Sequence, residues 1–210
     1  MDKIVLTNVC KELSGKKVLD DINLELEKGC VYGFVGENGS GKTMLFRAIS
    51  GLMKIDSGAI VGDGKQLHKD VSVFDDVGIV LENAGLYPEF SGFMNLKFLS
   101  DIKKKINYDD IRCIIKKVGL DPNDKRPVKK YSLGMKQRIV LAQAFMEKPQ
   151  ILLLDEPTNA LDSDGIKLIR ELVEEEKKRG IIILIASHNK EDIEILCDKV
   201  FVIQKGRIVL

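Results

Sequence analysis

The chain has 210 residues, of which 44% are hydrophobic and 31% charged, and its formal net charge of +1 argues against a protein whose whole surface binds polyanions. One domain of this length can bury about 70% of its unfolded surface without disulfides, and the spacing of the four cysteines (Cys10, Cys30, Cys113 and Cys197) is typical of cytosolic thiols rather than of a disulfide framework or a zinc site. No apolar run approaches the roughly 20 residues of a membrane span, and the N-terminus lacks the layout of a signal peptide, so we expect a chain that is soluble or held at a membrane by a partner.

The first part of the chain has the pattern of strands. We expect strands over 4–9, 23–27 and 30–35, with a Lys-Gly turn before the last of them. A glycine-rich segment at 36–43, called the glycine loop below, follows, and a helix then runs to about Gly51. Residues 57–67 have the pattern of a short strand and a turn.

The second half changes from helical to alternating elements. The pattern from about 84 to 148 is mostly helical, with one clear helix at 108–119. Strands at 151–154 and 181–186 then alternate with helices at 165–180 and 190–198, and a hairpin spans 199–210. This alternation predicts an α/β fold in which a mixed, mostly parallel sheet has helices on both faces. We interpret 1–83 and 149–210 as the core of a single domain, with N-terminal antiparallel strands, and about 84–148 as an inserted helical subdomain.

The glycine loop matches the pattern G-x-x-x-x-G-K-[S/T]. It reads Gly36, Glu37, Asn38, Gly39, Ser40, Gly41, Lys42 and Thr43. Glycines let several backbone N–H groups converge on a phosphate chain, and the N-terminus of the next helix adds partial positive charge. We expect Lys42 to reach the β- and γ-phosphates and the Thr43 hydroxyl to bind Mg²⁺. A turn that matches by chance is the alternative, and the flanking strand and helix disfavour it.

Polar residues follow two buried strands downstream. Asp155 ends the strand at 151–154, which suits a metal-bound water, and Glu156 is placed to orient an attacking water and accept its proton. His188 follows the strand at 181–186, at the carboxyl edge where α/β sheets bind ligands. We therefore expect His188 to contact the γ-phosphate or the water, although a lone histidine is more often structural.

A basic stretch stands out from the balanced charge of the chain. Residues 97–130 contain eleven Lys or Arg against five Asp, a net of +6. Solvated helix faces are the simpler interpretation, and a surface that faces acidic lipid headgroups or nucleic acid is the alternative.

Two further segments suggest a family. YSLGMKQR at 131–138 precedes the Asp155-Glu156 strand, and NALD at 159–162 follows it. Together with the glycine loop and His188, their order and spacing resemble an ATP-binding cassette (ABC) ATPase domain, a P-loop ATPase core, over nearly the whole chain. The resemblance implies that two such domains pair head to tail around two ATP molecules. It also implies that Ser132 and Gly134 of one protomer cap the γ-phosphate held by the other, and that Asp162 acts at the dimer interface.

Three positions depart from the usual pattern of the family. The signature L-S-G-G-Q is Tyr-Ser-Leu-Gly-Met here, and SLGMKQR resembles a subgroup of bacterial exporters of drugs, antibiotic peptides and lantibiotics. Glu82 stands where a glutamine usually contacts Mg²⁺ or the attacking water, and it adds negative charge there. Leu13 stands where an aromatic residue usually stacks on adenine, an interaction worth about 1–3 kcal/mol.

The resemblance implies an ATP-hydrolysing subunit of an exporter, with ATP and Mg²⁺ bound. Its expected partners are a second copy or a homologous subunit and membrane permease subunits on separate chains, with no nucleic acid, at the cytoplasmic face of the membrane. One alternative is a soluble cassette ATPase that acts on ribosomes or DNA. Another is an unrelated P-loop kinase or GTPase, and a GTPase is considered because Asn189, Lys190, Glu191 and Asp192 match the guanine-reading pattern N-K-x-D.

Overall fold

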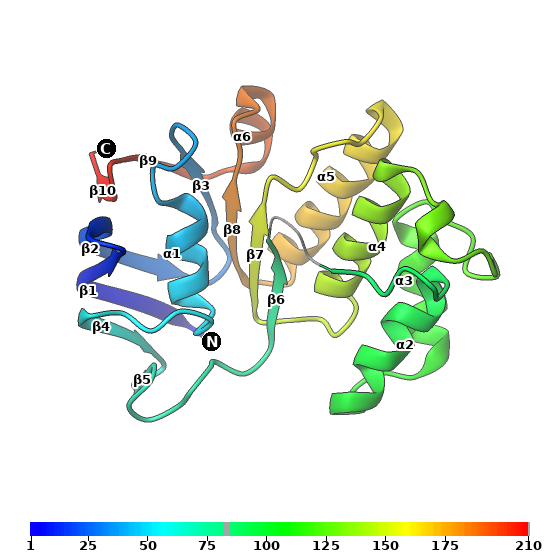
Figure 1. Cartoon of the computed structure of the whole chain (residues 1–210), viewed down its shortest axis with the longest axis horizontal. Helices are drawn as coiled ribbons and strands as arrows, with labels where there is room; N and C mark the ends of the chain where they lie inside the picture. The colour runs from blue at the N-terminus through cyan, green and yellow to red at the C-terminus, as the bar shows by residue number, and fades with distance from the viewer. Residues whose placement is uncertain (82–84, 210) are drawn as a thin grey trace.

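Two sheets and six α-helices form the protein in a computed structural model that describes residues 1–81 and 85–209 (Figure 1). The larger sheet has the strand order β10-β9-β3-β8-β7-β6 and is parallel except for the terminal β9–β10 hairpin. The smaller sheet is antiparallel, in the order β2-β1-β4-β5. The strands are β1 (Lys3–Leu13), β2 (Lys16–Glu27), β3 (Val31–Val35), β4 (Ser57–Gly62), β5 (Lys65–Gln66), β6 (Val77–Val80), β7 (Ile151–Asp155), β8 (Ile182–Ala186), β9 (Lys199–Gln204) and β10 (Arg207–Ile208).

The α-helices lie in the segments that have a helical pattern in the sequence. The helix expected at 108–119 begins with a capping box, in which the Asn107 side chain accepts from the backbone of Asp110 and the Asp110 side chain accepts from the backbone of Asn107. Across the described ranges, no helix has the combination of length and apolar character that crossing a bilayer requires. The helices are α1 (Lys42–Ile49), α2 (Gly92–Lys103), α3 (Tyr108–Lys117), α4 (Leu133–Phe145), α5 (Ser163–Lys178) and α6 (Lys190–Leu196), with a 3₁₀ turn at Val128–Lys130.

The larger sheet separates two hydrophobic cores. All residues of β7 and β8 are buried, as expected for strands covered on both faces. Ile151 and Leu153 pack with α1 and the antiparallel sheet, while Leu152 and Leu154 pack with α4 and α5. Helices therefore cover both faces, as expected, but α1 shares its face with the smaller sheet. This arrangement leaves the carboxyl ends of β3, β7 and β8 free to carry a site.

The helices α2, α3 and α4 lie together at the end of the molecule beyond β6 (Figure 1). β6 was not expected as a strand, and it pairs in parallel with β7 at the sheet edge. Its Gly78 allows close packing on α4, because a Cβ added there would lie 2.1 Å from the Ala144 carbonyl oxygen. The sheet edge thus packs directly against α4 of this group of helices, called the helical block below.

Candidate nucleotide-binding site

The glycine loop connects β3 to α1 at the carboxyl edge of the larger sheet. Gly41 caps α1 with a φ of 119°, and a Cβ added there would lie 2.7 Å from the Val18 carbonyl oxygen. Glycine is therefore required at this position by both conformation and space. A Cβ on Gly36 would likewise lie 2.7 Å from the Ser40 hydroxyl. The conformation of the loop therefore depends on close packing at two of its glycines.

Lys42 and Thr43 each have a partner in or near the loop. Lys42 Nζ donates to the carbonyl oxygens of Gly36 at 2.6 Å and Glu37 at 3.1 Å. Thr43 Oγ1 donates to Asp155 Oδ2 at 2.5 Å, which joins α1 to the end of β7. Hydroxyl and carboxylate oxygens are the ligands that Mg²⁺ takes in phosphate-binding sites, so this pair fits the expected ion.

Ser40 has a different environment from its neighbours. Its hydroxyl oxygen is buried and has no hydrogen-bond partner among the described residues. A buried polar atom without a partner costs free energy that a ligand can recover. Glu37, Asn38 and Gly39 are exposed on the outside of the loop.

A pocket of about 600 Å³ opens over the loop and α1. Leu13, from the end of β1, contributes an apolar side chain to it. Sequence reasoning did not single out Lys16 and Arg47, which also line it; Arg47 lies four residues after Thr43, hence on the same helix face. The lining residues are Leu13, Lys16, Val18, Asn38, Gly39, Gly41, Lys42, Thr43, Met44, Arg47, Asp155 and Glu156.

Glu156 and His188 meet beside this pocket. Glu156 follows β7 with a φ of 50°, and its N–H donates to the Ala186 carbonyl oxygen at 2.8 Å. Its Oε2 atom lies 2.8 Å from His188 Nδ1 and 3.5 Å from the Ser187 hydroxyl. The His188 side chain is 67% exposed, so the other edge of its ring is open to a ligand.

The signature residues begin α4. The Ser132 side chain caps this helix by accepting from the Met135 N–H at 3.2 Å. Gly134 allows close approach of the next loop, since a Cβ there would lie 2.8 Å from the Ala160 carbonyl oxygen. Leu133 is 71% exposed. Neither Ser132 nor Gly134 lines the pocket over the glycine loop of the same chain.

Gln137 and Arg138 connect α4 to the loop after Glu156, and neither residue had a role predicted from the sequence. Gln137 Nε2 donates to the Pro157 carbonyl oxygen at 3.3 Å, and Arg138 Nη2 donates to Asp162 Oδ1 at 2.5 Å. Asp162 also caps α5 by accepting from the Gly165 N–H at 3.0 Å. The Gly165 N–H and the Arg138 guanidinium hold the pKa of the Asp162 carboxyl below its ordinary value. The segment at 159–162 is thus bonded within its own chain.

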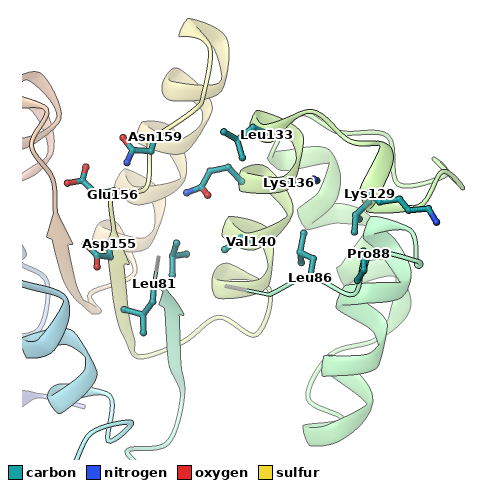
Figure 2. Close-up of a pocket in the computed structure, with 13 residues that line it drawn as sticks. Leu81, Leu86, Pro88, Lys129, Leu133, Lys136, Val140, Asp155, Glu156 and Asn159 are labelled. Atoms are coloured by element: carbon teal, nitrogen blue, oxygen red, sulfur yellow. The ribbon is translucent and has the colours of Figure 1, made fainter. Parts of the chain in front are cut away.

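A second hollow, of about 390 Å³, extends from Asp155 and Glu156 toward the helical block (Figure 2). Its far side carries the apolar side chains of Leu86, Pro88 and Val140 together with Lys129 and Lys136, as Figure 2 shows. Leu81 and Leu86 line it, and Glu82 lies outside the described residues. We call this hollow the β6–α4 groove.

The N-K-x-D match at 189–192 does not form a base-reading site. Asp192 is fully buried, and its carboxylate accepts from Thr158 and Arg170. A guanine base could not reach it without disrupting these contacts. The GTPase alternative therefore loses its main support.

A parallel α/β sheet with this loop between β3 and α1 defines a P-loop nucleotide-binding protein. Residues 19–159 match the family described as ABC transporter. The chain belongs to this family.

Individual relatives agree with this membership. The chain is 49% identical over 205 residues to the uncharacterized ABC transporter ATP-binding protein YybJ of Bacillus subtilis (strain 168), covering 98% of this chain and 94% of that protein. It is 36% identical over 206 residues to the lantibiotic transport ATP-binding protein SrtF of Streptococcus pyogenes, covering 98% and 88%. The fold matches the dimeric ABC transporter cassette MJ0796 with a TM-score of 0.87 at 22% identity, over 99% of this chain and 97% of that one.

Proposed function

We propose that the chain is the ATP-hydrolysing subunit of an exporter of antibiotic peptides or drugs, working as a head-to-tail dimer at the cytoplasmic face of the membrane. The observation that carries the proposal is the hydrogen bond of 2.5 Å between Thr43 and Asp155. Glu156 and His188 contact each other at the same edge of the sheet. Membership of the ABC transporter family and the similarity to a lantibiotic transport protein support the assignment to export.

Each part of the proposed chemistry is assigned to residues of the site described above. The backbone of the glycine loop and Lys42 bind the phosphates of ATP. Thr43 and Asp155 would hold Mg²⁺, which when bound neutralises charge on the β- and γ-phosphates. Glu156 orients the attacking water and accepts its proton, and His188 fixes the Glu156 carboxylate through the contact of 2.8 Å.

The proposed dimer would bring a second helix N-terminus to the γ-phosphate, which one chain does not bring to its own pocket. Ser132 and Gly134 lie at an exposed helix N-terminus and do not line the pocket of their own chain. In a head-to-tail pair the N-terminus of α4 would face the γ-phosphate held by the other copy, where its partial positive charge is favourable.

Membrane subunits on separate chains are the second proposed partner. The helical block presents the apolar side chains that line the β6–α4 groove together with the exposed aromatic side chains of Tyr87 and Phe90. The +6 stretch gives little support to ribosome or DNA binding, because seven of its eleven basic residues pair with acidic side chains. These seven are Lys97, Lys103, Lys105, Arg112, Lys117, Arg126 and Lys129.

The proposal is tested by co-expressing the chain with candidate polytopic membrane proteins and purifying it from the membrane fraction. We expect one of them to co-purify and to increase the ATP turnover of the chain. A chain that stays wholly cytosolic with every candidate, or that binds RNA or DNA in a salt-dependent manner, would contradict the assignment to export.

A further inference from the structure

Asp192 is a fully buried carboxylate that the proposed chemistry does not use. It lies in the first turn of α6, the helix that begins two residues after His188. Its Oδ2 atom accepts from the Thr158 hydroxyl at 2.5 Å, and its Oδ1 atom accepts from Arg170 Nε at 2.9 Å and Nη2 at 2.6 Å. One carboxylate thus joins the loop after Glu156 to α5 and α6.

The partners of Asp192 are themselves held in place. Thr158 is 7% exposed, and the Arg170 side chain, which is 19% exposed, also reaches Glu191 through Nη1 at 3.1 Å. A buried ion pair often stabilises a protein no more than apolar residues of the same volume, so a role in fixing one geometry explains this arrangement better than stability alone.

The bond between Thr158 and Asp192 lies beyond the other contacts between the same two segments. The Glu156 N–H donates to the Ala186 carbonyl, and the Glu156 carboxylate meets the Ser187 hydroxyl, the His188 N–H and the His188 ring. The Thr158–Asp192 bond lies two residues beyond Glu156 on one segment and four residues beyond His188 on the other. This bond therefore fixes both segments further along the chain than Glu156 and His188, whose contact the proposed chemistry needs.

We infer that Asp192, held by Arg170, acts through Thr158 as a positioning residue that sets the separation of Glu156 and His188. Neither Asp192 nor Thr158 lines the pocket over the glycine loop, so their effect on ATP binding is expected to be small. The expected effect is on turnover, because a displacement of about 1 Å in a reacting group can cost about 100-fold in rate. The inference rests on the proposed ATP hydrolysis.

A matched pair of substitutions tests the inference in the full chain. Thr158→Val keeps nearly the same volume and removes the hydroxyl, and we expect kcat to fall about 10- to 100-fold with the KM for ATP unchanged within about threefold. Thr158→Ser, which restores the hydroxyl, is expected to recover most of the lost kcat. Thr7→Val, on the exposed surface of β1, is the control for a threonine-to-valine change and should behave as the unmodified protein.

The outcomes separate this inference from the proposed function. A chain without ATP turnover before any substitution would contradict the proposed function itself. If the unmodified chain hydrolyses ATP and Thr158→Val only lowers the melting temperature, or raises KM as much as it lowers kcat, the positioning role is wrong. If Thr158→Val does not fold, Asp192→Asn, which keeps an acceptor oxygen for Thr158 but removes the charge that holds Arg170, is judged by the same kcat and KM criteria.

Discussion

Oε2 of Glu156 lies 2.8 Å from Nδ1 of His188, where the neighbouring strands β7 and β8 end. The contact places a carboxylate and an imidazole at one point beside the pocket over the glycine loop. We expect Glu156→Gln to lower ATP turnover by about 100-fold or more while ATP still binds, because an amide cannot accept the proton of water. Phosphate release measures the first effect and calorimetric titration the second.

The same variant also reports on assembly. A dimer that closes around ATP and cannot hydrolyse it should accumulate, so Glu156→Gln is expected to elute as a dimer in ATP and as a monomer after ATP is removed. Substantial turnover by this variant would show that Glu156 is not the general base.

Lys42 is predicted to supply much of the affinity for the phosphates. Its Nζ atom lies at the loop carbonyls, and hydrogen bonds to charged groups contribute about 1.5–3 kcal/mol. Lys42→Ala is therefore expected to weaken ATP binding by about 10- to 100-fold in calorimetric titration. Lys54→Ala, at an exposed position outside the loop, is the control and should bind ATP normally. Equal affinity of the two variants would remove Lys42 from the site.

Leu13 is predicted to limit affinity for the base. It is 42% exposed at the mouth of the pocket, so a larger side chain has room there. We expect Leu13→Tyr to strengthen ATP binding by about 1–3 kcal/mol through stacking, as measured by titration. Leu52→Tyr, at another exposed leucine, should leave the affinity unchanged. No gain with Leu13→Tyr would place the base elsewhere.

Asp162 should make stability depend on pH in the acid range. Its pKa is lowered in the folded chain, first by the Gly165 N–H and then by Arg138, so the folded state binds a proton less readily than the unfolded state. The stability it contributes is full above the unfolded pKa of about 3.9 and is lost as pH falls through the lower folded value. Asp162→Asn keeps a side chain that can cap α5 without the charge.

We therefore expect the unmodified chain to exceed Asp162→Asn in free energy of unfolding at pH 6, with the difference shrinking below about pH 4. Urea titrations across this range measure it. A difference that does not change with pH would mean that the charge of Asp162 is not the cause.

Local sequence was sufficient to place the motifs that lie on continuous segments at the ends of strands. The glycine loop, Asp155 and Glu156 each follow a short apolar strand, so motif and element could be identified together. β6 was missed because only the four residues Val77–Val80 form it, and one of them is a glycine. The antiparallel sheet beside α1 could not be predicted as a face of the core, because it is brought there by packing between distant segments.

The contacts that join separate segments could likewise not be predicted from the sequence. Asp192 was interpreted as part of a guanine-reading match, yet its partners Thr158 and Arg170 lie 34 and 22 residues away. Arg138 stood inside the signature segment without a predicted role, because nothing local indicates that it reaches Asp162. Such pairs depend on how α4, α5 and α6 pack, which a motif does not specify.

Cys197 should be the least reactive thiol of the chain. Burial raises its pKa to about 12, with Asp198 and Asp192 adding to the effect, whereas Cys113 is exposed. Because the thiolate is the reactive form, we expect a maleimide at pH 8 to label Cys113 rapidly and Cys197 only after unfolding, as read by mass spectrometry of peptides. The raised pKa also means that the stability contributed by the neutral thiol is full below about pH 8.5 and is lost as pH rises toward 12. Early labelling of Cys197 in the folded chain would show that α6 separates from β3 more readily than its buried contacts imply.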